Sequence, residues 1–216
     1  MKDILHFLEE LKENNHREWF HGQKERYTGC RDMFMQFIAS LIAGIGDFDP
    51  MVALQSPKDC VFRINRDIRF SKDKTPYKLH FGAFISYEGR KSTGPGYYVH
   101  IQPGKTYFGA GVYAPEPAKL AEIRNTLDEN GQALLDIINA KSFKDFELEA
   151  VKLKRMPKAY HDTHPFADLL KYKSFFAGKQ FSDEEVVSEN FHATLIDTAK
   201  RLLPFNNFFY QGLNIA

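Results

Sequence analysis

The chain has 216 residues, of which 43% are hydrophobic and 14% aromatic, so it can bury a sizeable core rich in aromatic rings as one domain. Its 29 lysines and arginines almost balance 28 acids, and the resulting net charge of +1 argues against a general DNA-coating or membrane-surface role. No apolar run is long enough to span a membrane and the first residues are too charged for a signal peptide, so the expected location is cytoplasmic.

The first fifty residues predict two helices. Apolar side chains at helical spacing predict a short helix that ends near Asn14. Asn15 and Glu18, three residues apart, then have the form of a capping box that starts the next helix. An apolar face that runs from Phe20 to Ile45 predicts that this second helix is long.

Between residues 61 and 114 the apolar pattern changes to a period of two, which is typical of strands. Turn signals divide the region into four predicted strands, at about 61–70, 79–88, 96–102 and 105–113. The last two, joined at Pro103-Gly104, form the clearest hairpin.

The C-terminal half returns to helical character over residues 116–140, with a break near Asn130. Further on we expect a charged strand at about 146–154 and a short helix at about 164–172. Another strand is expected at about 174–181, followed by a long final helix that Ser182 caps. The prediction is a single α+β domain spanning residues 1–216, with a central, mostly antiparallel sheet at about 61–114 and helices packed against it.

Positive charge is concentrated in the segment 62–78, FRINRDIRFSKDKTPYK. Six basic residues stand against two acids, so its local net charge is 6 − 2 = +4. Such a concentration indicates an anion-binding surface. The predicted ligand-binding residues are Arg63, Arg66, Arg69, Lys72, Lys74, Tyr77 and Lys78.

Side chains on a strand alternate between its two faces, so position along the predicted strands sorts the polar residues. The residues expected to share one face are Arg63, Asp67, Arg69, His80, Tyr98 and His100. In such a site the arginines would hold an anion, while Asp67, Tyr98 and His100 are the candidates for proton transfer and catalysis. The alternative is a solvated sheet face whose charges only keep the protein in solution.

Arg66 is the exception, because it falls on the apolar face of its predicted strand. An unpaired buried guanidinium is costly, so we expect Asp67 or another acid to pair with it, or a bulge to turn it outward. The residues from Ser71 to Pro76 are expected to form an irregular loop, either a phosphate clamp or a solvated turn.

The sequence predicts no metal site and identifies no cofactor. Cys30 and Cys60 have no metal-ligand spacing and are expected to be reduced thiols that are not joined. His161 and His164 flank Asp162, but this spacing matches no established zinc motif, and a turn that leads into a helix explains it better.

The chain resembles domain-of-unknown-function family 2461 over essentially its whole length. The resemblance rests on NNHREWF at 14–20 and FRINRDIRFSKDKTPYK at 62–78, supported by GYYVHIQPG, GAGVYAPEP and LKRMPKAYHDTHPFADLLKYKS further on. The resemblance implies no activity, no cofactor and no catalytic residue for this chain. It does mark as the family motif Arg66, Asp67, Arg69, Lys72, Asp73, Lys74, Tyr77 and Lys78.

Three functions fit this sequence. The first is a site, enzymatic or not, for a small molecule that bears a phosphate or a carboxylate. The second, disfavoured by a pI of about 7.8, is a nucleic-acid module in which Tyr98 and Tyr107 stack on bases while the lysine loop meets phosphates. In the third, the arginine-rich segment is a structural ion-pair network with no ligand.

Overall fold

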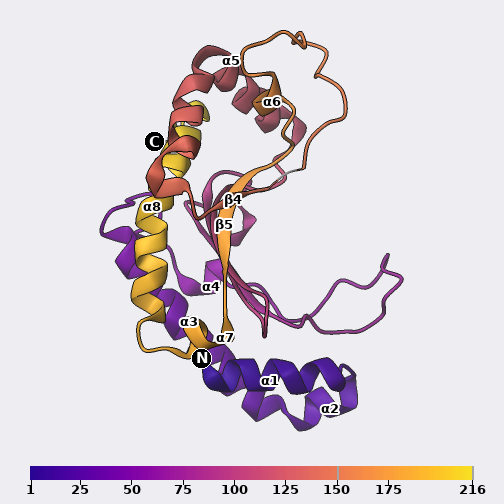
Figure 1. The fold of residues 1–216 in the computed structure, drawn as a ribbon. Coiled ribbons are helices and arrows are strands. Elements are labelled where there is room, and N and C mark those ends of the chain that lie inside the picture. The colour runs from indigo at the N-terminus through magenta and orange to yellow at the C-terminus, as the bar shows by residue number, and fades with distance from the viewer. Residues whose placement is uncertain (150, 216) are drawn as a thin grey trace. The chain divides into compact units, whose positions relative to one another are not determined.

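The computed structural model describes residues 1–149 and 151–215, and its fold is α+β (Figure 1). Five strands form one antiparallel sheet in the order β1-β2-β3-β5-β4, which confirms the predicted fold class. The strands are β1 (Phe81–Ser86), β2 (Gly96–Ile101), β3 (Thr106–Val112), β4 (Glu147–Leu148) and β5 (Phe175–Phe181).

Eight α-helices are found in the described part of the chain. They are α1 (Lys2–Glu13), α2 (Arg17–Gly22), α3 (Lys24–Gly46), α4 (Pro57–Cys60), α5 (Pro117–Asn139), α6 (Ala167–Leu170), α7 (Asp183–Val187) and α8 (Phe191–Gly212). Short 3-10 turns occur at Gly89–Lys91 and Lys141–Phe143. None of the described helices combines the length and the apolar character that crossing a membrane requires.

The chain divides into two compact units. The first comprises Met1–Arg90, Tyr98–Phe108 and Gln180–Ile196, and the second comprises Lys91–Tyr97, Gly109–Lys179 and Asp197–Ala216. Strands β2, β3 and β5 contribute residues to both units. The single-domain expectation for residues 1–216 stays a prediction.

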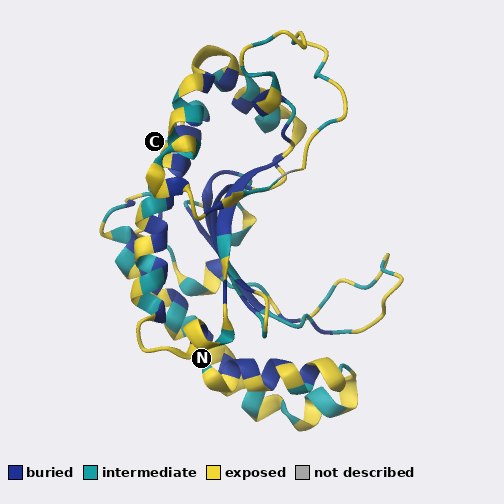
Figure 2. Ribbon diagram, in the orientation of Figure 1, coloured by how far each residue is buried: buried dark blue, intermediate teal, exposed yellow. Residues whose placement is uncertain are grey.

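The N-terminal helices follow the predicted pattern with one correction. The buried residues of α1 lie on one face, and its dark blue stripe is visible in Figure 2. The predicted long second helix is wrong, because α2 and α3 are separated at Gln23, whose φ of −103° and ψ of 14° are not helical. His16, and not Asn15, accepts the Trp19 N–H at the start of α2. Asn15 is therefore available for another contact.

Aromatic rings fill the core of the first unit, as the composition predicts. Phe7 of α1 lies 6.0 Å from Tyr27 of α3, measured between ring centroids. Tyr27 stacks on Phe81 of β1 at 6.1 Å, and Phe34 of α3 lies 5.4 Å from the same ring. These contacts fix β1 against α3.

The predicted strand at 61–70 is wrong, because this stretch forms only isolated bridges. Val61 pairs with Ala83 and Asn65 pairs with Tyr77, both antiparallel. Val61 and Asn65 are separated by four positions in the sequence, whereas Tyr77 and Ala83 are separated by six, and the unequal lengths interrupt the ladder. Below these bridges the chain opens into a loop, residues 66–76, whose outer residues are mostly exposed (Figure 2).

In the second unit, the predicted break in the helix at residues 116–140 is confirmed. Asn130 of α5 has a φ of −141° and a ψ of 35°, which kinks the helix. The ring of Phe166 covers Gly131, where a Cβ atom would lie only 2.5 Å from the ring, so glycine is required there. Of the predicted strand 146–154, only β4 is formed among the described residues, and residue 150 lies outside them.

The final helical region also differs from expectation. Ser182 is a helix cap as predicted, in a capping box with Glu185, but the helix that it starts is the short α7 and not the long final helix. Ser188, with a φ of −68° and a ψ of 150°, breaks the helix before α8 begins. A stripe of apolar residues of α8 is buried from Phe191 onward, whereas Val187 in α7 is 48% exposed.

Candidate functional site

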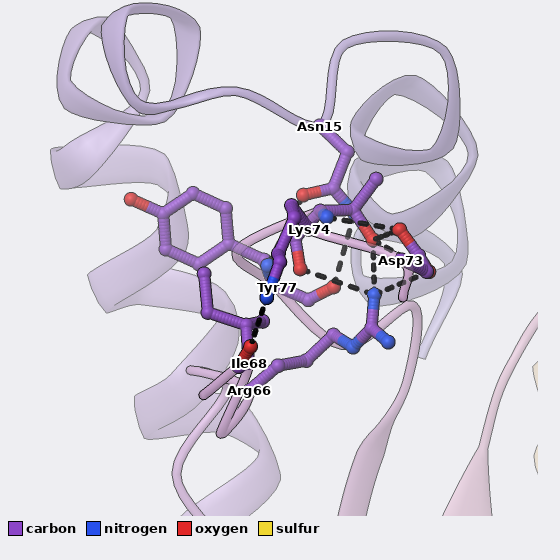
Figure 3. Close-up of polar contacts among 7 residues, drawn as sticks. Asn15, Arg66, Ile68, Asp73, Lys74 and Tyr77 are labelled. Atoms are coloured by element: carbon purple, nitrogen blue, oxygen red, sulfur yellow. Dashed lines mark hydrogen bonds and ion pairs between the residues drawn. The ribbon is translucent and has the colours of Figure 1, made fainter. Parts of the chain in front are cut away.

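The basic segment 62–78 is anchored to the turn between α1 and α2. The Asn15 side chain makes two hydrogen bonds to the backbone of Tyr77: its Nδ2 donates to the carbonyl oxygen at 3.0 Å, and its Oδ1 accepts from the N–H at 3.1 Å (Figure 3). The Tyr77 ring is buried and stacks on Phe20 at 3.9 Å between centroids, with an interplanar angle of 16°. Tyr77, predicted to bind ligand, therefore lies in the core.

Arg66 pairs within the loop, which resolves its anomalous position in the sequence pattern. Its Nη1 donates to Asp73 Oδ2 at 2.5 Å and to the Thr75 carbonyl oxygen at 3.1 Å, and it also contacts the Thr75 hydroxyl (Figure 3). The Thr75 backbone N–H and the Arg66 guanidinium lower the pKa of Asp73 to about 2. The acid that pairs with Arg66 is therefore Asp73, and not Asp67.

Asp67 pairs with Arg69. The Arg69 Nε and Nη2 donate to the two carboxylate oxygens of Asp67 at 2.9 and 2.7 Å. This guanidinium lowers the pKa of Asp67, so the carboxyl stays ionised. Both side chains are exposed. Asp67 is thus poorly suited to proton transfer at neutral pH.

These two ion pairs show which residues account for the net positive charge of the segment. Arg66–Asp73 and Arg69–Asp67 cancel two positive and both negative charges. The local charge of +4 therefore belongs to the four other basic residues, Arg63, Lys72, Lys74 and Lys78. Arg63 and Lys78 lie at the base of the loop, next to the bridges, whereas Lys72 and Lys74 lie toward its tip, which is the loop end away from the bridges.

Lys78 is the one of these four that is held in a half-buried position. Its Nζ donates to the backbone oxygen of Arg63 at 2.9 Å and lies 5.4 Å from the centroid of the Phe62 ring. Burial, and secondly the nearby charge of Arg63, lower the pKa of Lys78. Two cations thus lie close together, and neither has a carboxylate partner among the described residues.

A line of polar side chains runs along one face of β2. The Tyr98 hydroxyl lies 3.0 Å from Nδ1 of His100, and Nε2 of His100 lies 2.9 Å from Oε1 of Gln102. The Gln102 oxygen only accepts hydrogen bonds, so Nε2 of the neutral imidazole carries the proton and Nδ1 accepts from Tyr98. Tyr98 and His100 are half-buried, whereas the alternate residues of β2 form the core.

His80 completes this group. Its ring stacks on that of His100, with centroids 4.1 Å apart and an interplanar angle of 26°. Burial, together with the charges of His100 and Lys78, lowers the pKa of His80 to about 3. Burial also lowers the pKa of His100. At neutral pH the histidine face, defined as His80, Tyr98, His100 and Gln102, is therefore uncharged.

Lys78 lies beside the histidine face. Its charge acts on His80, two residues further along the same arm. The Phe62 ring that Lys78 covers also lies 6.5 Å from the Tyr98 ring in an edge-on arrangement. Gly82 lies against Tyr98 and His80: a Cβ atom at this position would be 3.3 Å from the Tyr98 hydroxyl and 3.4 Å from the His80 ring.

The predicted set of site residues thus separates into two groups. Tyr98, His100 and His80 come together, as the alternation of β1 and β2 predicts. Asp67 and Arg69 instead pair with each other in the exposed loop. Strand alternation does not determine which way these two side chains point, because residues 61–70 do not form a strand.

Two residues of the site, Gln102 and Asn15, were not among the site residues predicted from the sequence. Gln102 continues the alternation of Tyr98 and His100 by two residues, so the strand pattern itself was the signal for it. The anchoring by Asn15 had no such signal, because its partner Tyr77 is 62 residues away in the sequence.

No group of three or more potential metal ligands occurs within residues 1–149 and 151–215. The histidine closest to Pro165 in the sequence, His164, already uses both ring nitrogens. Its Nε2 lies 2.8 Å from Asp128 Oδ1, and its Nδ1 accepts the Phe166 N–H at 3.0 Å. Cys30 and Cys60 are free thiols and both are buried.

Comparison with known proteins gives one match. The model of a family described as a conserved hypothetical protein (DUF2461) matches residues 3–208, which is nearly the whole chain. The matched range includes both the 62–78 segment and the histidine face. No curated protein and no solved structure matches the chain.

Proposed function

The chain belongs to the conserved hypothetical protein family DUF2461, and we propose that it binds a small molecule bearing a phosphate or a carboxylate at Lys78 and Arg63, beside the histidine face. The observation that carries the proposal is that Lys78 and Arg63 lie close together with no carboxylate partner among the described residues. Burial and the charge of Arg63 both disfavour the charged form of Lys78. A bound anion would offset both costs and accept charge-assisted hydrogen bonds.

The neutral histidine face suits the recognition of such a ligand. Uncharged imidazole and phenol groups offer directional hydrogen bonds without repelling or neutralising the anion. Among the predicted catalytic residues, Tyr98 and His100 are the proposed pair for proton transfer, because a hydrogen bond of 3.0 Å already joins them.

The other basic residues of the segment have different roles in this proposal. We infer that Arg66 and Arg69 maintain the loop, since each guanidinium is already engaged with a carboxylate. The structural-network hypothesis thus describes these two arginines, whereas Arg63 and Lys78 bind the ligand. The cytoplasmic location stays part of the proposal, and it is supported by the two free, buried thiols.

A panel of inorganic phosphate, glycerol phosphate and succinate, measured by thermal shift and isothermal titration calorimetry, tests the anion site. Lys78→Met removes the ammonium but keeps the stem that covers Phe62, so the fold should be preserved. We expect it to weaken binding roughly tenfold to a hundredfold, the effect of one charge-assisted hydrogen bond.

Lys72→Met is the matched control. It makes the same change of charge in the same segment, at a side chain that is exposed and near the end of the loop. We expect it to leave binding of the three probes unchanged. The proposal fails if no probe binds the wild type, or if the two variants lose affinity equally.

A further inference from the structure

Phe70, near the middle of the loop 66–76, is the feature that the proposed anion site does not explain. Its side chain is 96% exposed, although most of the other phenylalanines in the chain are buried. A single exposed apolar residue on a surface is ordinary. Phe70 differs because it is presented by a loop whose shape is held by several hydrogen bonds.

These hydrogen bonds close the loop on both sides of Phe70. Lys74 Nζ donates to the Ile68 carbonyl oxygen at 2.9 Å (Figure 3). The backbone N–H of Ser71 donates to the same oxygen at 3.3 Å. The Arg66 contacts with Asp73 and Thr75, described above, brace the base of the turn. The loop is therefore preorganised, which lowers the entropic cost of binding through it.

The exposed ring shares its loop with several cations. The Arg69 guanidinium lies 5.8 Å from the centroid of Phe70. Lys72 has no carboxylate partner among the described residues, and Lys74 donates only one of its three N–H groups within the loop. Both acids of the loop are already neutralised by arginines, so the charge presented to a partner is positive.

We propose that the loop end formed by Arg69, Phe70, Lys72 and Lys74 is a docking site for single-stranded nucleic acid, in which an unpaired base stacks on Phe70 and the lysines contact the flanking phosphates. A single accessible ring suffices for base stacking, and neighbouring cations provide the phosphate contacts. This site differs from the sheet tyrosines that the sequence suggested for the same type of partner, and it does not depend on the anion site at Lys78.

The same surface fits other macromolecules less well. Stable membrane binding needs more than one apolar anchor, and the loop offers a single exposed aromatic ring. A protein interface would need an apolar patch of several residues, whereas the residues that flank Phe70 are polar. Charge complementarity therefore favours a polyanion with stacking bases.

Fluorescence anisotropy with labelled ten-residue oligo-dT and oligo-U tests the proposal on the full chain. Phe70→Ala should weaken binding on the order of tenfold, whereas Phe70→Trp should retain it. Leu54→Ala is the matched control, since Leu54 is 97% exposed and lies outside the loop, and binding should not change. Lys72→Ala should weaken binding and reduce the salt dependence, by about 0.7 in the slope of log K against log salt concentration.

Three outcomes would overturn the proposal. They are no oligonucleotide binding by the wild type, equal binding by Phe70→Ala and Leu54→Ala, and co-sedimentation with phosphatidylserine vesicles that Phe70→Ala abolishes while oligonucleotides fail to bind. Binding of inorganic phosphate is measured separately, so failure of the anion site and failure of the loop site are distinguishable.

Discussion

Asn15 holds the backbone of Tyr77 through both polar atoms of its side-chain amide, with Nδ2 donating at 3.0 Å and Oδ1 accepting at 3.1 Å. The turn between α1 and α2 thereby fixes the end of the basic segment, 62 residues away in the sequence. Lys78, the next residue, is held by its own hydrogen bonds as well, from its N–H to the Ile64 carbonyl oxygen at 2.8 Å and from Nζ to the Arg63 carbonyl oxygen at 2.9 Å. We infer that the anchoring of Tyr77 helps to position the neighbouring Lys78 in the proposed anion site.

We predict that Asn15→Ala lowers the free energy of unfolding by about 1–3 kcal/mol, the usual contribution of two hydrogen bonds to partly buried groups. The measurement is urea denaturation, with hydrogen exchange across residues 66–78. Exchange should become faster in that segment in the variant. Asn65→Ala, a change of the same type at an exposed position, serves as the control and should have little effect.

A second prediction concerns the Arg66–Asp73 pair. The Asp73 carboxyl should titrate near pH 2 by carbon-detected NMR, and Arg66→Gln should raise this pKa toward the usual value of 3.8. Because the folded-state pKa is depressed, the stabilising effect of the carboxylate is complete above pH 3.8 and is lost as the pH falls toward 2. An unchanged Asp73 titration in the variant would mean that Thr75 alone stabilises the carboxylate.

A third prediction concerns the close approach of backbone at Gly111. Its φ is +125°, and a Cβ there would lie 2.1 Å from the Phe175 carbonyl oxygen and 2.8 Å from the Phe205 ring. Gly111→Ala should therefore cost about 3 kcal/mol or more, or prevent folding. Gly104→Ala is the control: its φ is +67° but nothing lies within 4 Å, so only a strain of roughly 1–2 kcal/mol is expected. Comparable losses in thermal denaturation would contradict this explanation.

The sequence predicted those parts of the protein that depend on local patterns. Period-two alternation located β1, β2 and β3 and grouped Tyr98 with His100, because strand geometry alone determines which side chains share a face. The same rule failed for Asp67 and Arg69. Their positions depend on pairing between two arms of unequal length, which no alternation pattern encodes.

Competition between partners is the other reason that prediction fell short. Asn15 is a good helix cap by residue type, yet His16 takes that position and Asn15 bonds to a distant backbone. Either acid of the basic segment could have paired with Arg66, and only the geometry of the turn selects Asp73. Composition therefore revealed the net charge of the segment, but not which four of its cations lack a carboxylate partner among the described residues.

The final prediction uses the depressed pKa of His80. The folded-state pKa of about 3 lies below the ordinary value of 6.5, so the unfolded chain binds this proton more tightly. The stabilising effect of neutral His80 is complete above pH 6.5 and declines by about 1.4 kcal/mol per pH unit as the pH falls toward 3. At pH 5 the loss should be about 2 kcal/mol relative to pH 7.

His80→Phe keeps an aromatic ring against His100 but cannot be protonated, so its stability should depend less steeply on pH between 7 and 4. His161→Phe, at an exposed histidine, should follow the wild-type curve. Urea denaturation at several pH values provides the comparison, because the slope with pH counts the protons taken up on unfolding. Parallel curves for wild type and His80→Phe would mean that His80 is accessible enough to be protonated in the folded state, and that the histidine face is not neutral below pH 6.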